Sequence, residues 1–196
     1  MTRIWRYVLA ADNGMAPCAQ GGVLTLTCCK PMIRRQAANG DYVIGFLPKR
    51  LGSGRVAYVG QVADRLPLGE YHRQHPDRRD AIYRAMPGPR GEEVLEPLRD
   101  DYHLDEVSRR RDRDGLYGLR FAPYWYWGGE GVLAPEEIAD LAHYYVGQSA
   151  RGSTAERVES LKAWLAGMGR QGTLGVPRNE LKTAGATVRR GKARGC

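Results

Sequence analysis

The sequence predicts a single α+β domain, a small β-barrel or curled sheet with peripheral helices. Four runs rich in β-branched and aromatic residues fall within the first 65 residues, which is typical of strands. The last third of the chain instead places apolar residues at helical spacing. A length of 196 residues fits one domain with a small appendage, and no internal repeat indicates a solenoid or propeller.

The first four strands are bounded by turn-forming residues, with a short helix between the second and the third. β-branched and aromatic side chains favour strands because they pack well on a pleated surface. The helix is expected over residues 32–39 and ends at Gly40, which turns the chain into the next strand. The expected strands are residues 3–11, 22–28, 41–47 and 55–63.

A polar, partly helical insert is expected over residues 66–115. Within it, residues 77–86 predict a short helix that places Ile82, Tyr83 and Met86 on one face. Residues 106–114 alternate in charge and contain few apolar side chains, which favours a solvated loop over the alternative, a binding surface.

One more strand and two helices complete the expected domain. Residues 117–127 have strand composition, and Pro123 restricts this strand to an edge or a strand end. The first helix starts at Pro135, and the second follows a capping-box sequence at residues 153–156. Their apolar stripes are typical of core packing, with Ile138, Leu141, Ala142 and Tyr145 in the first and Val158, Leu161, Leu165 and Met168 in the second.

The formal net charge is +8, and much of the excess lies at the C-terminus. Residues 182–196 contain five basic side chains and no acid. We therefore divide the chain into a single domain at residues 1–181 and a basic, disordered tail at residues 182–196. Such a tail favours nucleic acid through phosphate neutralisation, although a solvated terminus has the same composition.

Several other classes lack their sequence signals. No stretch approaches the roughly 18 apolar residues of a membrane span, and the N-terminus lacks the apolar core of a signal peptide. We expect a cytoplasmic protein with no membrane partner. The four cysteines include no Cys-x-x-Cys pair, and the common phosphate-loop, dinucleotide, serine-elbow and zinc-helix motifs are absent. We therefore predict no metal site and no cofactor.

The first candidate site is the loop at residues 12–17, in which an acid, an amide, a glycine and a proline follow a hydrophobic strand. Loops held on a strand framework often carry binding residues. Asp12, Asn13, Gly14 and Pro17 are therefore candidate nucleotide contacts, and Asp12 is also a candidate catalytic acid or base. The alternative is an Asx turn satisfied by the side chain of Asp12 or Asn13.

The second candidate site is the end of the second strand and the helix after it. Thr25, Lys30, Arg34 and Arg35 are candidate nucleotide or nucleic-acid contacts, because basic side chains bind phosphate. A neighbouring lysine lowers the pKa of a thiol, so Cys29 is a candidate nucleophile and Lys30 a candidate for stabilising negative charge. No histidine lies nearby in the sequence, which leaves a buried, inert cysteine as the alternative.

The third candidate site is aromatic. On a strand, Trp125 and Trp127 point to one side, while Tyr124 and Tyr126 point to the other. With Tyr7, these tryptophans are candidates for stacking on a flat base. The alternative is that they only pack in the core.

Separate motifs, in order, make the chain resemble a known family. They are Asp-Asn-Gly-Met-Ala-Pro at residues 12–17, Leu-Thr-Leu-Thr-Cys-Cys-Lys-Pro-Met-Ile-Arg at 24–34, Gly-Asp-Tyr-Val-Ile-Gly at 40–45 and Phe-Ala-Pro-Tyr-Trp-Tyr-Trp-Gly at 121–128. Over about residues 5–175 the chain resembles the second nucleotide modification associated domain family of bacteria and phages. The resemblance implies association with systems that modify bases in DNA and leaves the activity open. The family pattern maps onto Asp12, Gly14, Ala16, Pro17, Cys29, Lys30, Pro31, Ile33 and Arg34.

The chain also departs from that pattern. Residues 18–20 (Cys-Ala-Gln) replace a common Asn-Pro-aromatic run, and Leu24 replaces a common cysteine, so paired thiols in this strand are in doubt. A looser similarity is to PUA-like barrels, which include the base-recognising EVE and YTH domains. That similarity implies a PUA-like form of the predicted fold, by analogy only.

Three functions remain open from the sequence. The leading hypothesis is a nucleic-acid-directed protein of DNA modification or phage defence that binds DNA, or a modified or flipped nucleotide, in an aromatic-walled pocket. The alternative is a transferase or hydrolase that acts on a nucleotide or a DNA base through Asp12 and Lys30. A scaffolding subunit is the third. The expected partners are DNA or a nucleotide, and the proteins of a DNA-modification system.

Overall fold

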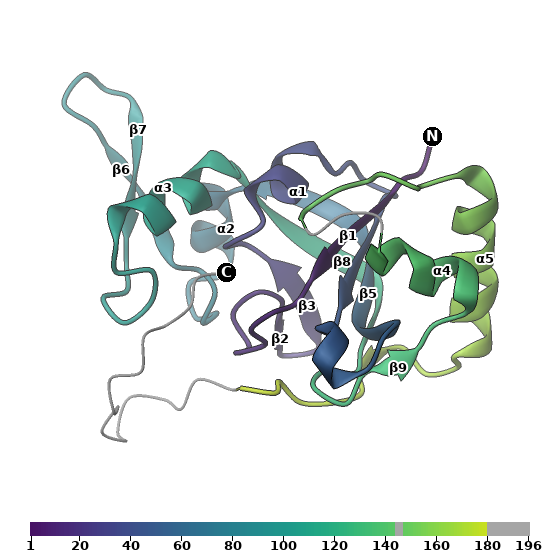
Figure 1. The fold of residues 1–196 in the computed structure, drawn as a ribbon. Coiled ribbons are helices and arrows are strands. Elements are labelled where there is room, and N and C mark those ends of the chain that lie inside the picture. The colour runs from purple at the N-terminus through teal and green to yellow at the C-terminus, as the bar shows by residue number, and fades with distance from the viewer. Residues whose placement is uncertain (144–146, 180–196) are drawn as a thin grey trace.

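A large mixed sheet forms the centre of the fold in the computed structural model, which describes residues 1–143 and 147–179 (Figure 1). Its strands pair in the order β1-β4-β5-β8-β3-β2, with β9 on β5 and β10 on β8. Pairs β1–β4 and β10–β8 are parallel, and the other pairs are antiparallel. The strands are β1 Ile4–Val8, β2 Cys18–Gln20, β3 Val23–Leu26, β4 Tyr42–Phe46, β5 Arg55–Pro67, β8 Tyr117–Tyr126, β9 Val132–Leu133 and β10 Gly172–Thr173.

The α+β class and the curled sheet are confirmed, and the five main expected strands are all present. Over the described ranges the sheet does not close into a barrel, since β1 and β2 remain its two edges. Register shifts interrupt the long β5–β8 pairing near Gly60, and such irregularities increase local bending and twist.

The helices and one hairpin lie around this sheet. The hairpin of β6 and β7 is a separate two-stranded sheet that projects from the body at the upper left of Figure 1. The remaining elements are α1 Pro31–Gln36, η1 Lys49–Leu51, α2 Leu68–Gln74, β6 Tyr83–Pro87, β7 Glu93–Pro97, α3 Glu106–Asp114, α4 Glu136–Ala139, η2 Asp140–His143 and α5 Ala155–Gly167.

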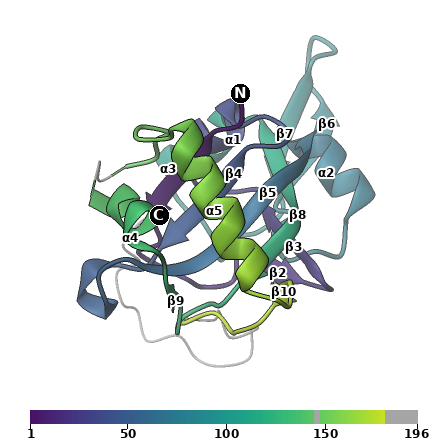
Figure 2. The same cartoon turned by 90° about the vertical axis from the view of Figure 1, so that its right-hand side faces the viewer.

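Each face of the sheet buries its own core. On one face α5 lies across the strands, as Figure 2 shows, and its Val158, Leu161 and Leu165 pack with Trp125 and Trp127. Full burial of one such aliphatic side chain stabilises the fold by roughly 1.5–3 kcal/mol. The opposite face holds the larger cluster, which includes both Cys28 and Cys29. Side chains therefore alternate along β8 as predicted, but both faces are covered.

The helix predicted over residues 77–86 is wrong. The helix lies earlier, in α2, and Tyr83 begins strand β6. Asp80 is buried between them and accepts hydrogen bonds from Thr25 Oγ1 at 2.5 Å and from Tyr71 OH at 3.0 Å. These distant contacts fix the chain at Asp80. The local spacing of apolar residues therefore predicted a helix that is not formed.

The solvated loop predicted over residues 106–114 is also wrong, because these residues form α3. Asp105 caps the helix, since its Oδ1 accepts from the Ser108 N–H at 2.8 Å. Most of the charged side chains are indeed exposed or half-exposed, but Asp112 is fully buried. A single buried acid anchors this polar helix to the body.

The C-terminal helices follow the prediction with shifted boundaries. The N-cap of α5 is Thr154, whose Oγ1 accepts from the Arg157 N–H at 3.2 Å, while Ser153 Oγ accepts from the Ile4 N–H. The helix expected after Pro135 is the short α4 continued by η2, and Tyr145 lies outside the described residues. The tail at 182–196 lies outside them too. No helix in the described ranges is both long and apolar enough to cross a bilayer.

Candidate thiol site

Cys29 and Lys30 form a sharp turn between strand β3 and helix α1. Their φ angles are 55° and 44°, so two consecutive residues with side chains adopt the left-handed region that favours glycine. Such conformations cost roughly 1–3 kcal/mol each and occur preferentially at functional sites. A strand–turn–helix that presents a strained nucleophile is the arrangement of the serine elbow of hydrolases. Here the residue at the turn is a cysteine.

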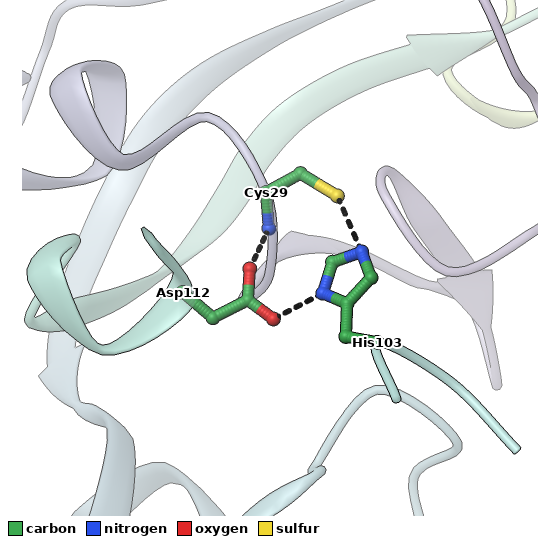
Figure 3. Close-up of side chains that lie close together, drawn as sticks. All are labelled: Cys29, His103 and Asp112. Atoms are coloured by element: carbon green, nitrogen blue, oxygen red, sulfur yellow. Dashed lines mark hydrogen bonds and ion pairs between the residues drawn. The ribbon is translucent and has the colours of Figure 1, made fainter. Parts of the chain in front are cut away.

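The imidazole of His103 lies between Cys29 and Asp112 (Figure 3). Its Nδ1 is 2.5 Å from Asp112 Oδ2, and its Nε2 is 3.7 Å from Cys29 Sγ. The carboxylate and the thiol thus face opposite ring nitrogens. This is the geometry in which a carboxylate orients a histidine that takes a proton from a nucleophile.

Asp112 is held by partners from several parts of the chain. Its Oδ1 accepts from the backbone N–H of Cys29 at 2.5 Å, and its Oδ2 accepts from Tyr83 OH at 3.1 Å. The Arg34 guanidinium lies 4.0 Å from Oδ1, and both side chains are completely buried. A buried charge requires such a partner and hydrogen bonds. Asp112 therefore fixes both the nucleophile's backbone and the histidine ring.

Tyr102 completes the surroundings of the thiol. Its hydroxyl is 3.3 Å from Cys29 Sγ, and its ring stacks on His103 with centroids 4.0 Å apart. Burial raises the pKa of Tyr102, so its hydroxyl remains a donor. His103 has a φ of 49°, the third left-handed residue of the site. The stack on Tyr102 and the contact with Asp112 hold the histidine at the thiol in spite of this strain.

A hollow of about 210 Å³ opens beside these residues. Lys30 lies at its edge, with Nζ 4.7 Å from the centre of the Tyr7 ring, and no described carboxylate forms an ion pair with it. Burial lowers the pKa of this ammonium, and the charge of Asp112 acts in the opposite direction. The hollow is lined by Cys29, Lys30, Pro31, His103, Ser108, Arg111, Asp112 and Gln148.

The three described cysteines differ chemically. Cys18 and Cys28 are free and buried, and burial raises the pKa of Cys18 to about 12 and that of Cys28 well above its ordinary value. Cys29 takes part in a disulfide in the structure. A nucleophilic role therefore belongs to the reduced form of Cys29, and Cys18 and Cys28 are inert packing residues.

Cys29, His103 and Asp112 also offer donor atoms within 4.8 Å of one another, which is a set that can hold a divalent metal. Two features favour the relay instead. Asp112 and the Cys29 Sγ face different nitrogens of the imidazole, and both carboxylate oxygens already accept hydrogen bonds. We therefore interpret the cluster as a thiol, a base and its orienting acid.

The predicted loop at residues 12–17 packs behind this site and does not line the hollow. Asp12 is fully buried and accepts from Tyr126 OH at 2.9 Å, which gives it a packing role rather than access to the hollow. Asn13 Oδ1 accepts from the Met15 N–H at 3.1 Å, so the Asx turn is present. The Asn13 side chain also hydrogen-bonds to Tyr102. Gly14 has a φ of 80° and, with Pro17, is buried behind the site.

The predicted phosphate contacts do not lie together in the structure. Lys30 lines the hollow, whereas Arg34 is fully buried and donates from Nε to the Cys29 carbonyl at 2.7 Å and from Nη1 to the Tyr117 carbonyl at 2.9 Å. Arg34 is therefore a structural cation and not a phosphate contact in this structure. Arg35 is exposed away from the hollow, and Thr25 is buried against Asp80.

The predicted aromatic wall is not assembled beside the thiol. Trp125 and Trp127 belong to the cluster under α5, on the face of the sheet opposite Cys29. Tyr7 is buried in the cluster of Cys29, and its ring contacts only the edge of the site through Lys30. For the tryptophans the core-packing alternative describes their position.

Comparison with known proteins identifies the family of the chain. The model of nucleotide modification associated domain 2 matches residues 1–184. The chain belongs to this family. No curated protein and no solved structure matches it. The family name associates the chain with nucleotide modification and specifies no reaction.

In this member of the nucleotide modification associated domain 2 family, sequence reasoning found Cys29 and Lys30 but missed His103 and Asp112. Both missed residues lie more than seventy positions after Cys29, in the insert that the sequence predicts to be polar and partly helical. One signal was available: Asp112 lies within the charged run, and His103 lies shortly before it. Nothing local distinguishes them from surface residues, because their function depends on the docking of α3 against α1.

Proposed function

We propose that the protein is a thiol-dependent enzyme of nucleotide modification, in which Cys29 attacks an electrophilic carbon of a nucleotide or of a base in nucleic acid. The observation that carries this proposal is the continuous contact Asp112–His103–Cys29 at a strained strand–helix turn. The family name supports a nucleotide as the substrate class, and the geometry supports thiol chemistry. The reaction class is transfer or hydrolysis.

The residues support a two-stage substitution. His103 Nε2 takes the proton of Cys29 Sγ, and the thiolate adds to an sp² carbon while the π electrons move to its oxygen or nitrogen. The Lys30 ammonium stabilises the negative charge that develops there. As the bond to the leaving group breaks, its atom takes the proton from His103. Water or an acceptor then attacks the thiol-bound carbon, gives its proton to His103 and releases Cys29.

Asp112 acts on this sequence through the histidine. Its carboxylate keeps the proton on Nδ1, so that Nε2 faces the thiol, and it stabilises the imidazolium that forms after proton transfer. Because Asp12 is packed against Tyr126 behind the site, we assign no catalytic step to it. Nucleotide recognition is assigned to the residues around the hollow rather than to Trp125 and Trp127, because the tryptophans lie on the other face of the sheet.

The test is the alkylation of Cys29 by iodoacetamide, followed by peptide mass spectrometry between pH 5 and 9. The background is Cys196→Ser under constant reduction, which leaves Cys18, Cys28 and Cys29 as the only cysteines. We expect Cys29 to react while Cys18 and Cys28 stay protected, with a midpoint below the ordinary thiol pKa of about 8.5. His103→Gln should lower the rate at pH 7 at least tenfold, and the surface control His72→Gln should leave it unchanged.

The wild-type profile alone decides the proposal if the His103 variant does not fold. A Cys29 that reacts only with the midpoint of an ordinary thiol, or not at all while the protein is folded, contradicts the relay. Equal rates in wild type and a folded His103→Gln variant would do the same.

A further inference from the structure

A second hollow lies directly beside the thiol site. It measures about 540 Å³ and is lined by Arg3, Trp5, Met32, Gln36, Gln148, Ser149, Ala150 and Arg151. Gln148 lines both hollows, and the neighbours Pro31 and Met32 line one each. The two hollows therefore adjoin at Gln148 and at the start of α1.

The size of the first hollow makes the second one relevant. Small-molecule sites usually measure about 300–1,000 Å³, and the hollow at Cys29 is smaller, at about 210 Å³. A hollow of this size can hold only part of a nucleotide, so the remainder of such a substrate would lie outside it. The adjoining hollow is the space that continues from it.

The charges along this path are mostly positive. Among the residues that line the two hollows there are four cations, namely Arg111, Lys30, Arg3 and Arg151, and one acid, Asp112. Asp112 is fully buried and engaged with His103. Asp41 pairs with Arg3 at 3.0 Å, although 40% of the Arg3 side chain remains exposed. Arg111 and Arg151 are both exposed.

The cations lie in both hollows. Arg111 on α3 lines the hollow that contains Cys29, and Arg3 and Arg151 line the adjoining hollow. A free mononucleotide carries phosphate at one end only, whereas a nucleotide within a strand has a phosphate on each side of its sugar. Arginine binds phosphate oxygens strongly through its planar fork of donors.

We propose that the two hollows form one path for a single strand of nucleic acid, with the reacting base at Cys29 and the flanking backbone phosphates at Arg111 and at Arg3 and Arg151. This inference rests on the proposed function and specifies its substrate as a base within a strand. Gln148 is the residue at the junction, with its Oε1 accepting from the Ile33 N–H at 3.2 Å. That bond fixes the side chain where the two hollows adjoin.

The test is fluorescence anisotropy of a labelled twelve-nucleotide single-stranded DNA with the full chain at several salt concentrations. Arg111→Glu and Arg151→Glu should each weaken binding at least fivefold. Each should also reduce the salt slope, since every lost phosphate contact on a single strand removes about 0.7 from it. The matched control is Arg90→Glu at the exposed tip of the β6–β7 hairpin, which changes the charge equally and should leave binding within twofold.

Competition with a mononucleotide separates the two sources of phosphate. At equal phosphate concentration the mononucleotide should not displace the strand. Displacement, together with an effect of Arg151→Glu but not of Arg111→Glu, would overturn the strand and indicate a free nucleotide. An Arg90→Glu loss as large as that of the path variants, or no loss in any variant, would also overturn the path.

The binding result and the thiol result can fail independently. A reactive Cys29 without binding that depends on Arg111 and Arg151 would support the thiol-dependent enzyme and contradict the strand as its substrate. The reverse result would support binding of the strand and contradict the thiol-dependent enzyme.

Discussion

The guanidinium of Arg34 lies 4.0 Å from Oδ1 of Asp112, and neither side chain is exposed to solvent. Arg34 also donates to the backbone carbonyls of Cys29, Tyr117 and Asp112. One buried cation thus joins the nucleophile turn, strand β8 and the end of α3. Because these three segments are far apart in sequence, Arg34 is the residue that brings the thiol and its orienting acid together.

Replacing Arg34 with Met should therefore destabilise the protein strongly. The substitution leaves Asp112 as a buried charge without its cation and leaves carbonyls without donors. Breaking a buried pair in this way costs about 3–5 kcal/mol. Urea unfolding measures the loss, with the exposed neighbour Arg35→Met as a control that should stay within about 0.5 kcal/mol of wild type. If the two variants unfold at the same urea concentration, Arg34 has no such role.

Gly115→Ala should disturb the same contact through sterics alone. The backbone of Gly115 has an ordinary φ of −71°, but a Cβ there would collide with the Arg34 guanidinium. Overpacking of this kind costs typically 1–3 kcal/mol, and the displaced Arg34 should slow Cys29 alkylation. Gly167→Ala in α5 is the opposite case, since nothing lies within 4 Å of its Cβ. There alanine should stabilise by about 0.5–1 kcal/mol. Thermal unfolding of both variants distinguishes a steric effect from a general effect of alanine.

The sequence predicted the elements whose stability comes from regular apolar patterning. Strands β1, β3, β4, β5 and β8 and helix α5 all carry such patterns, and all are present. The pattern fails in the insert, where Asp80 and Asp112 are the buried residues that determine the structure. A buried acid has the same sequence appearance as an exposed one, because its burial depends on hydroxyl and guanidinium partners that are distant in the chain.

The site was half predictable for the same reason. Cys29 and Lys30 lie in a dense motif next to a strand end, so local reasoning and the family resemblance both reach them. The absence of a histidine near Cys29 in the sequence argued against a nucleophile, yet His103 reaches the thiol from the insert. Arg34 belongs to the motif, but only its burial shows that it supports the site rather than binding phosphate.

The stability of the protein should decrease at alkaline pH. Burial raises the pKa of the Cys18 thiol to about 12, above the value of about 8.5 in an unfolded chain. The folded state thus keeps a proton that the unfolded state releases, so the free energy of unfolding falls as pH rises from about 9 to 12. At about 1.4 kcal/mol per pKa unit, Cys18 contributes up to roughly 4 kcal/mol of that fall.

Buried tyrosines whose pKa is also raised, such as Tyr58 and Tyr71, act in the same direction. Cys18→Ala should therefore reduce the dependence on pH without abolishing it. Urea unfolding of the reduced protein at pH 7, 9 and 10.5 measures both slopes. Identical slopes in the variant and wild type would show that Cys18 is not the group that titrates.

Tyr102→Phe should make Cys29 a weaker nucleophile at neutral pH. The Tyr102 hydroxyl lies 3.3 Å from Cys29 Sγ, and because burial raises the pKa of Tyr102, the hydroxyl stays protonated and donates to the thiolate. A hydrogen bond to a charged group is worth about 1.5–3 kcal/mol, so its loss should raise the midpoint of Cys29 alkylation by about one to two pH units. The ring is retained, so its stacking on His103 persists and the effect belongs to the hydroxyl.

Alkylation of Cys29 across pH measures this midpoint, with Tyr42→Phe as the control. Tyr42 lies in the cluster on the other face of the sheet, and its variant should keep the wild-type midpoint. A midpoint that does not move in Tyr102→Phe would mean that the hydroxyl accepts from the thiol instead of donating to the thiolate. In that case the thiolate would depend on His103 alone, and the loss of reactivity in His103→Gln should be complete rather than partial.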